Sequence, residues 1–162
     1  MAEALIALGG NLGDVRTIFD QAIAKLVEGN AVRLLARSSD YRTPPWGVTE
    51  QPPFINAAIA VTTSLSPHEL LALTKATERT LGRDPGRERH WGPRPIDLDI
   101  LAYDDFELHD PDLTLPHPYM FERAFVLVPL AEIAPDRTIA GTTVREALAR
   151  TDTSGIERLP PR

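Results

Sequence analysis

A strict alternation of aliphatic and acidic residues constrains the fold of this chain more than any other feature of its sequence. The run is Ile96-Asp97-Leu98-Asp99-Ile100. Because successive side chains of a β-strand point to opposite faces, the run predicts a strand with an aliphatic face and an acidic face. Such a strand is typical of an antiparallel sheet with one face on a core and the other open.

The two carboxylates of this strand are candidates for binding a cation. Positions two apart on one strand are separated by ~6.5–7 Å, so Asp97 and Asp99 line one surface and can share a cation or flank two. Asp is a poor strand former, and like charges on one face repel. A hard cation such as Mg²⁺ would remove that penalty. The alternative is an ordinary solvent-facing side of an antiparallel strand, and the five residues alone do not decide between the two.

The hydrophobic pattern predicts an α+β fold with the order β-α-β-β-α-β, followed by further helices. Strands are expected at residues 4–8, 32–42, 54–64 and 96–103, and helices at about 14–28, 66–81, 124–133 and 143–150. Asp14 can cap the first helix, and Ser66-Pro67-His68-Glu69 combines a cap, a proline at the first helical position and a glutamate two residues after it. The order is that of the ferredoxin-like fold, in which helices cover one face of a mainly antiparallel sheet.

Composition limits the classes of function. The 162 residues are expected to form a single domain, 1–162, with a polar tail, 151–162, that packs weakly or frays. A net charge of −6 argues against a nucleic-acid partner, and the absence of Cys excludes a thiol nucleophile. No signal-like start or bilayer-spanning stretch is found, so no membrane partner and a cytoplasmic location are expected. A monomer is expected.

Basic residues are concentrated just before the aspartate strand. The segment 82–94 holds four Arg, three Gly, two Pro and Trp91. The Gly and Pro content indicates a loop that can move, and Arg presents a planar fork that suits phosphate oxygens. In an acidic protein, arginines beside two aspartates favour a phosphate and metal site over the alternative, a solvated surface loop.

A second group of candidates follows the aspartate strand. His117 lies between two prolines, where it can donate a hydrogen bond to a phosphoryl oxygen, although a single His is more often a surface or capping residue. Arg123 opens the helix expected at 124–133, where a positive side chain opposes the helix dipole. An incoming anion would remove this conflict.

A proline-rich segment supplies a third group. It begins at Thr43 and Pro44, includes Trp46, and leads to Phe54 and Asn56 at the start of an apolar strand. The Asn56 amide can read the edge of a ring by paired hydrogen bonds, and Phe54 can stack on that ring. Taken alone, the segment favours the plainer interpretation, a loop with Trp46 in the core.

Together these segments resemble the hydroxymethyl-dihydropterin pyrophosphokinase family, folate-pathway enzymes that transfer a pyrophosphoryl group from ATP. The similarity covers residues 4–135 in the family's order and spacing. The matching blocks are Leu8-Gly9-Gly10-Asn11-Leu12-Gly13, Tyr41-Arg42-Thr43-Pro44-Pro45-Trp46-Gly47, Phe54-Ile55-Asn56-Ala57-Ala58, Trp91-Gly92-Pro93-Arg94-Pro95-Ile96-Asp97-Leu98-Asp99-Ile100 and Leu115-Pro116-His117-Pro118 through Arg123-Ala124-Phe125. The family commonly has Ser where Gly10 stands and Thr where Pro95 stands.

The resemblance implies a reaction and a role for each matching residue. The hydroxymethyl oxygen of 6-hydroxymethyl-7,8-dihydropterin would attack the β-phosphorus of ATP and release AMP, with two Mg²⁺ ions held by Asp97 and Asp99. The implied catalytic residues are Arg83, Arg94, Asp97, Asp99 and His117. The implied ATP contacts are Glu78, Arg87, Trp91, Arg94, Ile100, His117, Tyr119 and Arg123. The implied pterin contacts are Phe54 and Phe125 on the two faces of the ring, with Asn56 and the backbone of Thr43, Pro44 and Trp46 at its edge.

Two other classes of function remain open from the residues alone. A metal-dependent phosphohydrolase or nuclease could use the same aspartates without a pterin. An RNA-binding ferredoxin-like module would need exposed aromatics on the sheet and a basic face, and the strands at 32–42 and 96–103 lack such a pattern.

Overall fold

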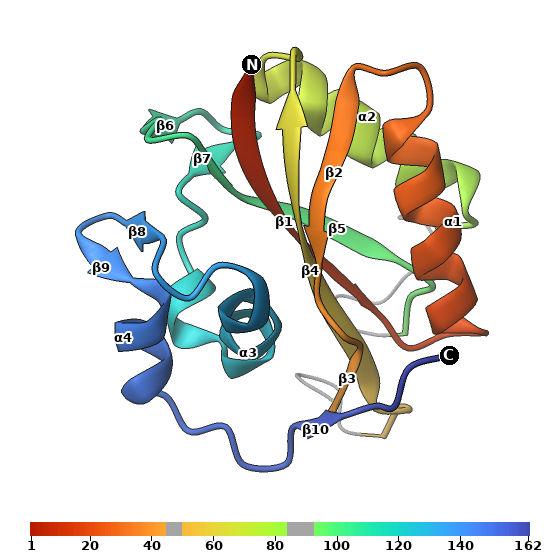
Figure 1. The fold of residues 1–162 in the computed structure, drawn as a ribbon. Helices are drawn as coiled ribbons and strands as arrows, with labels where there is room; N and C mark the ends of the chain where they lie inside the picture. Colours follow the sequence, from red (N-terminus) through yellow and green to blue (C-terminus); the bar gives the residue numbers. More distant parts are fainter. Residues whose placement is uncertain (45–49, 84–92) are drawn as a thin grey trace.

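The computed structural model describes residues 1–44, 50–83 and 93–162. An antiparallel sheet forms the centre, with α1 (Val15–Val27) and α2 (Pro67–Thr80) on one side and α3 (Ala124–Ile133) and α4 (Val144–Ala149) on the other (Figure 1). The predictions for Trp46, Arg87 and Trp91 fall outside the described residues.

The six-stranded sheet has the order β10-β3-β4-β1-β5, with β2 also paired to β4. Its strands are β1 (Ala2–Gly10), β2 (Val32–Arg37), β3 (Tyr41–Thr43), β4 (Phe54–Thr63), β5 (Asp97–Tyr103) and β10 (Glu157–Arg158). Two small hairpins, β6 (Leu108–His109) with β7 (Thr114–Leu115) and β8 (Thr138–Ile139) with β9 (Thr142–Thr143), and a 3₁₀ turn, η1 (Met120–Glu122), complete the fold. The predicted β-α-β-β-α-β order is confirmed, with its second strand divided into β2 and β3.

Both predicted helix starts are present. The Asp14 carboxylate accepts a hydrogen bond from the Thr17 backbone N–H at the start of α1. At the start of α2, the side chains of Ser66 and Glu69 each accept a hydrogen bond from the other residue's backbone N–H. These contacts satisfy N–H groups that the first turn of a helix leaves without partners.

The sheet has a core on each face. The core under α1 and α2 holds Phe19, Leu26, Leu70 and Leu98. The opposite face, expected to be free, is partly covered because α3 packs on it. The residues of this second core include Leu5, Ala7, Ala58, Leu101, Ala102, Leu127 and Leu130. The pairing of β1 with β5 shifts between Leu5 and Ile6, which gives β5 an extra residue where its acidic part becomes apolar.

The strand expected at 32–42 is two strands, β2 and β3, because the chain bends at Ser38–Asp40. Ser38 exchanges hydrogen bonds with Ala58, using its N–H as donor and its Oγ as acceptor. The Asp40 carboxylate, 4% exposed, accepts hydrogen bonds from Arg16 and Arg37. A buried carboxylate held by two guanidinium groups ties the bend to α1. No local sequence pattern predicts this bend.

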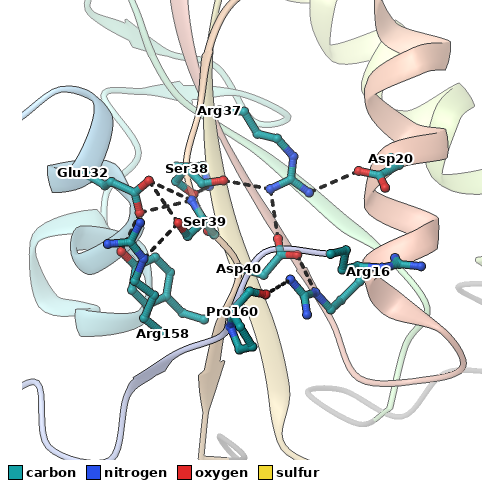
Figure 2. Close-up of polar contacts among 12 residues, drawn as sticks. Arg16, Asp20, Arg37, Ser38, Ser39, Asp40, Glu132, Arg158 and Pro160 are labelled. Carbon is teal, nitrogen blue, oxygen red and sulfur yellow. Dashed lines mark hydrogen bonds and ion pairs between the residues drawn. The ribbon is translucent and has the colours of Figure 1, made fainter.

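Residues 151–162, the tail expected to pack weakly or fray, are mostly exposed, yet part of the tail pairs with the sheet. Its strand β10 pairs with β3, and the Leu159 N–H donates to the Asp40 carbonyl oxygen at 2.9 Å. An Arg16 N–H donates to the Pro160 carbonyl oxygen at 2.6 Å (Figure 2). The partners of the tail lie more than 100 residues earlier in the chain, so local composition could not predict them.

Candidate active site

The acidic face of β5 lies beside two small residues of β1. In the register of the sheet, Asp97 is opposite Gly9 and Asp99 is opposite Ala7. Leu98 is buried on the other face, in the core under α1 and α2. The predicted alternation is therefore present, and both half-buried carboxylates point to the face that α3 partly covers.

Gly9 makes room for Asn56 on the neighbouring strand. The two residues are opposite each other in the β1–β4 pair, and a Cβ on Gly9 would lie 2.9 Å from Asn56 Nδ2. Asn56, Gly9 and Asp97 thus form a row across three strands of the sheet. The missing side chain in the middle of this row leaves a hollow between the amide and the carboxylate.

A cavity of about 320 Å³ opens over this row. That volume is in the range of small-molecule sites. The predicted site residues that line it are Thr43, Pro44, Phe54, Asn56, Arg83, Arg94, Asp97, Asp99, His117, Arg123 and Phe125. Residues from strands at both edges of the cavity, from the loop ahead of β5 and from the start of α3 therefore meet in one place, although they lie far apart in the sequence.

Ion pairs join Arg83 and Arg94 to the aspartate strand. One Arg83 nitrogen donates to Asp97 Oδ1 at 2.8 Å and to Glu78 Oε2 at 3.0 Å. Arg94 lies 3.8 Å from the other Asp97 oxygen. Glu78 also accepts the Leu98 backbone N–H at 2.7 Å, at the outer edge of β5. The buried Glu78 carboxylate therefore anchors both Arg83 and the strand that carries the aspartates.

Burial and neighbouring charge raise the pKa of two carboxylates, Asp99 and Glu78. Burial, with the charges of Asp97 and Glu78 added to it, raises the pKa of Asp99 to about 7. Burial also raises the pKa of Glu78, although the Leu98 N–H and the nearby Lys75 and Arg83 favour its charged form. A cation at this end of the cavity would lower the energy of these charges.

His117 lies against β5 with one ring nitrogen directed into its own turn. Its backbone N–H donates to the Leu101 carbonyl oxygen at 2.8 Å, and its Nδ1 accepts the Tyr119 N–H at 3.2 Å. In the neutral ring the proton is therefore on Nε2, which remains available as a donor. Burial, and then the charge of Arg123, lower the pKa of His117 and favour that neutral form at pH 7. Arg123 lies over the rings of Tyr119 and Phe125, at 5.4 and 5.7 Å from their centroids.

The other end of the cavity is uncharged. The Thr43 hydroxyl donates to Asn56 Oδ1 at 2.8 Å, so the amide is held with its NH₂ group over Gly9. Phe54, opposite Thr43 in the β3–β4 pair, adds aromatic surface, and Phe125, at the start of α3, lines the same cavity. This end offers hydrogen-bond donors and flat apolar contacts rather than charge.

Three predicted residues lie near the cavity without lining it. Glu78 is buried behind β5, Tyr119 is 54% exposed, and the Ile100 side chain is buried in the core under α1 and α2. Because the Leu98 N–H points to the outer edge of β5, the Ile100 N–H two residues later points the same way. Any contact of Ile100 with a nucleotide therefore falls to its backbone.

Two residues that the sequence reasoning missed belong to the site. Lys75 of α2 lines the cavity and lies 3.5 Å from Glu78. Asn11, buried at the end of β1, donates from Nδ2 to the Gln51 side chain at 2.8 Å, while its Oδ1 accepts the Arg94 N–H at 2.9 Å. An Asn directly after an apolar strand and two glycines was the available signal.

Gly10 and Pro95, two of the positions expected to depart from the family's common residues, lie close together. A Cβ on Gly10 would lie 2.5 Å from the Pro95 carbonyl oxygen. Any side chain at position 10 would therefore push this backbone away from β1. The close approach helps the Asn11 N–H reach the Arg94 carbonyl oxygen at 2.9 Å, which holds the start of the aspartate strand against the end of β1.

A second cluster of metal-ligand types lies outside the cavity. Within the described ranges, His68, Asp110 and Asp112 place ligand atoms within 4.8 Å of one another. They join the start of α2 to the β6–β7 turn through contacts of 3.0 and 3.4 Å, and none of the three lines the cavity. The helices of the described residues include none long and apolar enough to cross a membrane.

The fold and the cavity define a class of protein: an α+β enzyme whose site brings carboxylates and cations, suited to a phosphorylated substrate, beside an amide and two phenyl rings, suited to a flat ring. Comparison with known proteins identifies the family. The model of the 7,8-dihydro-6-hydroxymethylpterin-pyrophosphokinase (HPPK) family matches residues 5–135. The chain belongs to this family, so the expected pyrophosphokinase is confirmed.

Relatives along the whole chain agree. This chain is 54% identical over 159 residues to the 2-amino-4-hydroxy-6-hydroxymethyldihydropteridine pyrophosphokinase of Methylorubrum extorquens. The match covers 98% of this chain and 99% of that protein. The protein of the same name from Bacillus subtilis is 45% identical over 94% of this chain and 87% of its own length. The solved structure of Plasmodium falciparum HPPK-DHPS wild type superimposes with a TM-score of 0.74 at 16% identity, over 92% of this chain and 43% of that chain, and supports the fold.

Proposed function

We propose that the cavity is where this enzyme performs the reaction of its family, the transfer of pyrophosphate from ATP to 6-hydroxymethyl-7,8-dihydropterin in folate synthesis. The ATP phosphates would lie at the Asp97–Asp99 end and the pterin ring at the Asn56 end. The observation that carries the proposal is the division of one cavity into a charged end and a neutral, partly aromatic end. In the transfer, the hydroxymethyl oxygen bonds to the β-phosphorus, the hydroxyl proton is lost, and AMP leaves as the bond from the β-phosphorus to its α-side bridging oxygen breaks.

The charged end fits Mg²⁺. Asp97 and Asp99 offer two neighbouring carboxylates, and Mg²⁺ typically takes one or two carboxylates, with waters and substrate phosphates as its other ligands. Burial, and then the charges of Asp97 and Glu78, raise the pKa of Asp99, so a cation bound beside it would favour its charged form. We therefore assign two Mg²⁺ ions to Asp97 and Asp99. When bound, Mg²⁺ neutralises phosphate charge.

The basic side chains and the histidine at this end of the cavity would hold the ATP phosphates. Arg83 and Arg94 pair with Asp97, and His117, whose Nδ1 accepts the Tyr119 N–H, would offer its Nε2 proton to a phosphate oxygen. Arg123 lies at the N-terminus of α3, where an anion is favourable. Fixed cations around a transferred phosphoryl group stabilise the charge that develops on it, and the protein needs little other chemistry for this reaction.

The neutral end would hold the pterin. Asn56 would donate from its NH₂ group to the ring edge, and the Thr43 hydroxyl fixes the orientation of that amide. The ring would lie between Phe54 and Phe125. The backbone of Thr43 and Pro44 would complete the edge contacts. A ring held in this way would place its hydroxymethyl group toward the aspartates.

Further nucleotide contacts stay proposals. We propose that the backbone of Ile100 and the side chain of Tyr119 contact the nucleotide. Glu78 would contribute by holding Arg83 in position. Arg87 and Trp91 of the basic loop, and Trp46 of the pterin loop, stay predictions from the resemblance. The expected cytoplasmic monomer also stays a prediction, and gel filtration of the pure protein tests its oligomeric part.

The test is AMP formation from ATP and Mg²⁺, measured with and without the reduced pterin. The proposal expects AMP together with the pterin diphosphate ester, and at most slow AMP release when the pterin is absent. Release of nucleotide or phosphate at the same rate without the pterin would favour the phosphohydrolase alternative and contradict the proposal.

A further inference from the structure

Residues 155–162, which we call the strap, run beside β3 and finish near the start of α1 (Figure 1). Within the strap, Glu157 pairs with Arg42 and Arg158 pairs with Tyr41. The strap therefore covers the outer edge of β3, which is only three residues long and pairs with β4 on its other side. A strand this short has few hydrogen bonds of its own to hold it in place.

The strap also binds the bend that leads into β3. Arg16 of α1 donates from Nε to the buried Asp40 carboxylate at 2.8 Å and from a terminal nitrogen to the Pro160 carbonyl oxygen at 2.6 Å (Figure 2). The Asp40 carbonyl oxygen accepts the Leu159 N–H at 2.9 Å. One guanidinium group thus joins the strap, the bend and α1.

A second set of contacts joins the strap to α3. Arg158 donates to Ser39 Oγ at 3.0 Å, and the Ser39 N–H and hydroxyl donate to the Glu132 carboxylate. The Tyr41 hydroxyl donates to the same carboxylate at 2.6 Å. Tyr41 is the first residue of β3, so the strap, the bend and α3 all meet at the strand that enters the site (Figure 2).

These contacts reach the neutral end of the cavity through β3. Tyr41 is opposite Asn56, and Thr43, which donates to Asn56, is the last residue of the strand. Gly155 packs against the next residue, Pro44, since a Cβ on Gly155 would lie 3.0 Å from the Pro44 ring. The charged end lies on β5, and β4 and β1 separate β5 from β3.

We propose that the strap is a positioning element for the pterin: it holds β3 and Pro44 so that the Asn56 amide and the nearby backbone keep the geometry that the ring requires. This inference rests on the assignment of the pterin to the neutral end. It predicts a selective effect, because loss of the strap loosens β3 while the phosphate-binding end on β5 keeps its contacts. A merely structural role would lower stability and leave the two substrates equally affected.

The first test is a variant that ends at Ser154, compared with the full chain by steady-state kinetics. We expect the KM for the pterin to rise about tenfold, equivalent to about 1.4 kcal/mol of binding, with the KM for ATP within about twofold of the full chain. An unchanged pterin KM, or an equal rise in both KM values, would overturn the proposal. Thermal unfolding establishes whether the variant is folded.

A pair of point variants decides the matter if the shortened chain does not fold. Gly155 and Gly141 have φ values of +82° and +84°, so Ala imposes a similar backbone strain at both positions. A Cβ at Gly155 meets Pro44, whereas a Cβ at Gly141 has no atom within 4 Å among the residues described. We expect Gly155→Ala to raise the pterin KM about threefold and Gly141→Ala to leave it unchanged. Equal pterin KM values in the two variants would overturn the proposal.

The same assays on the full chain distinguish failure of the strap proposal from failure of the proposed function. If the full chain forms AMP with the pterin and the strap variants bind the pterin normally, the strap proposal fails and the function stands. If the full chain shows no pterin-dependent AMP formation, the proposed function fails, and the strap proposal, which rests on it, fails with it.

Discussion

The two ends of the cavity are stabilised in opposite ways. At the β5 end, Asp97, Asp99 and Glu78 lie together, and burial, with the charges of the other two added to it, raises the pKa of Asp99. At the β3 end, the Thr43 hydroxyl already satisfies the Asn56 carbonyl oxygen, and β10 covers the edge of the strand. At the charged end, Arg83 and Lys75 pair with Asp97 and Glu78, and the proposed cation would further favour the charged form of Asp99. At the neutral end, the protein's own hydrogen bonds already hold Asn56 in place.

This difference indicates that the β5 end controls the chemical step and the β3 end controls pterin affinity. Charge that is unfavourable before binding makes the β5 end depend on its ligands and on pH. Preorganised hydrogen bonds make the β3 end depend on packing of distant elements, because a ring edge is recognised only by groups at fixed positions. Substitutions at the two ends should therefore separate the chemical step from pterin affinity.

The largest expected effect comes from removing an acid at the β5 end. Asp97→Ala or Asp99→Ala should lower kcat by about a thousandfold, because each removes a carboxylate that we propose to hold the cations. Measurement of Mg²⁺-dependent AMP formation checks this, with circular dichroism to confirm the fold. Asp136→Asn, at an acid 83% exposed on the surface, is the matched control and should keep full activity. Near-normal turnover of either site variant would reject the assignment.

The second-largest effect is expected at the neutral end of the cavity, where a substitution should change pterin affinity. Asn56→Ala should weaken pterin binding about 10- to 100-fold, the equivalent of hydrogen bonds worth ~1–3 kcal/mol in a buried site. Affinity for an ATP analogue with Mg²⁺ should change by less than about twofold. Fluorescence titration with the pterin and calorimetry with the nucleotide measure the two affinities. An unchanged pterin affinity would show that the ring binds elsewhere.

A substitution at Asn11, which links the two ends of the cavity, should affect the binding of both substrates. Asn11 contacts Gln51, in the segment before β4, and Arg94, in the segment before β5. Asn11→Ala should therefore weaken both the pterin and the nucleotide by about three- to tenfold, because one lost side chain frees both segments. The same two titrations measure it. A change in one affinity alone would mean that Asn11 does not link the two ends.

The smallest effect concerns stability and its pH dependence. Burial and the hydrogen bond to Glu132 raise the pKa of Tyr41 to about 12 from 10.0. Between these pH values the unfolded chain loses this proton and the folded chain keeps it, so the contribution of Tyr41 to stability falls as pH rises from about 10 to 12. Tyr41→Phe should lower the free energy of unfolding by about 1 kcal/mol at pH 8, with the difference shrinking above pH 10. Urea titrations of both proteins measure it, and a difference that grows with pH would contradict this account.

Local signals predicted most of the fold that places the site. Asp14 and the Ser66–Glu69 pair mark helix starts because capping needs only residues within one turn. The alternation at 96–100 predicted that Asp97 and Asp99 share a face, because a strand has a period of two. In both cases the partners are a few residues apart, which is the range in which sequence patterns carry structural information.

Long-range contacts account for what the sequence did not reveal. The bend at Ser38–Asp40 depends on Arg16 of α1, and the strap depends on contacts with residues more than 100 positions away. The α3 cover on the open face likewise depends on packing between segments far apart in the chain. Lys75 was missed because a single Lys on a helix has no local mark that distinguishes a cavity from solvent.

The central claim is that one cavity holds ATP at the Asp97–Asp99 end and the pterin at the Asn56 end. A crystal structure with Mg²⁺, a non-hydrolysable ATP analogue and the pterin tests it most directly. The account predicts metal density in contact with both carboxylates and the ring edge within hydrogen-bond distance of Asn56 Nδ2. Phosphates bound away from the aspartates, or a ring bound away from Asn56, would contradict it.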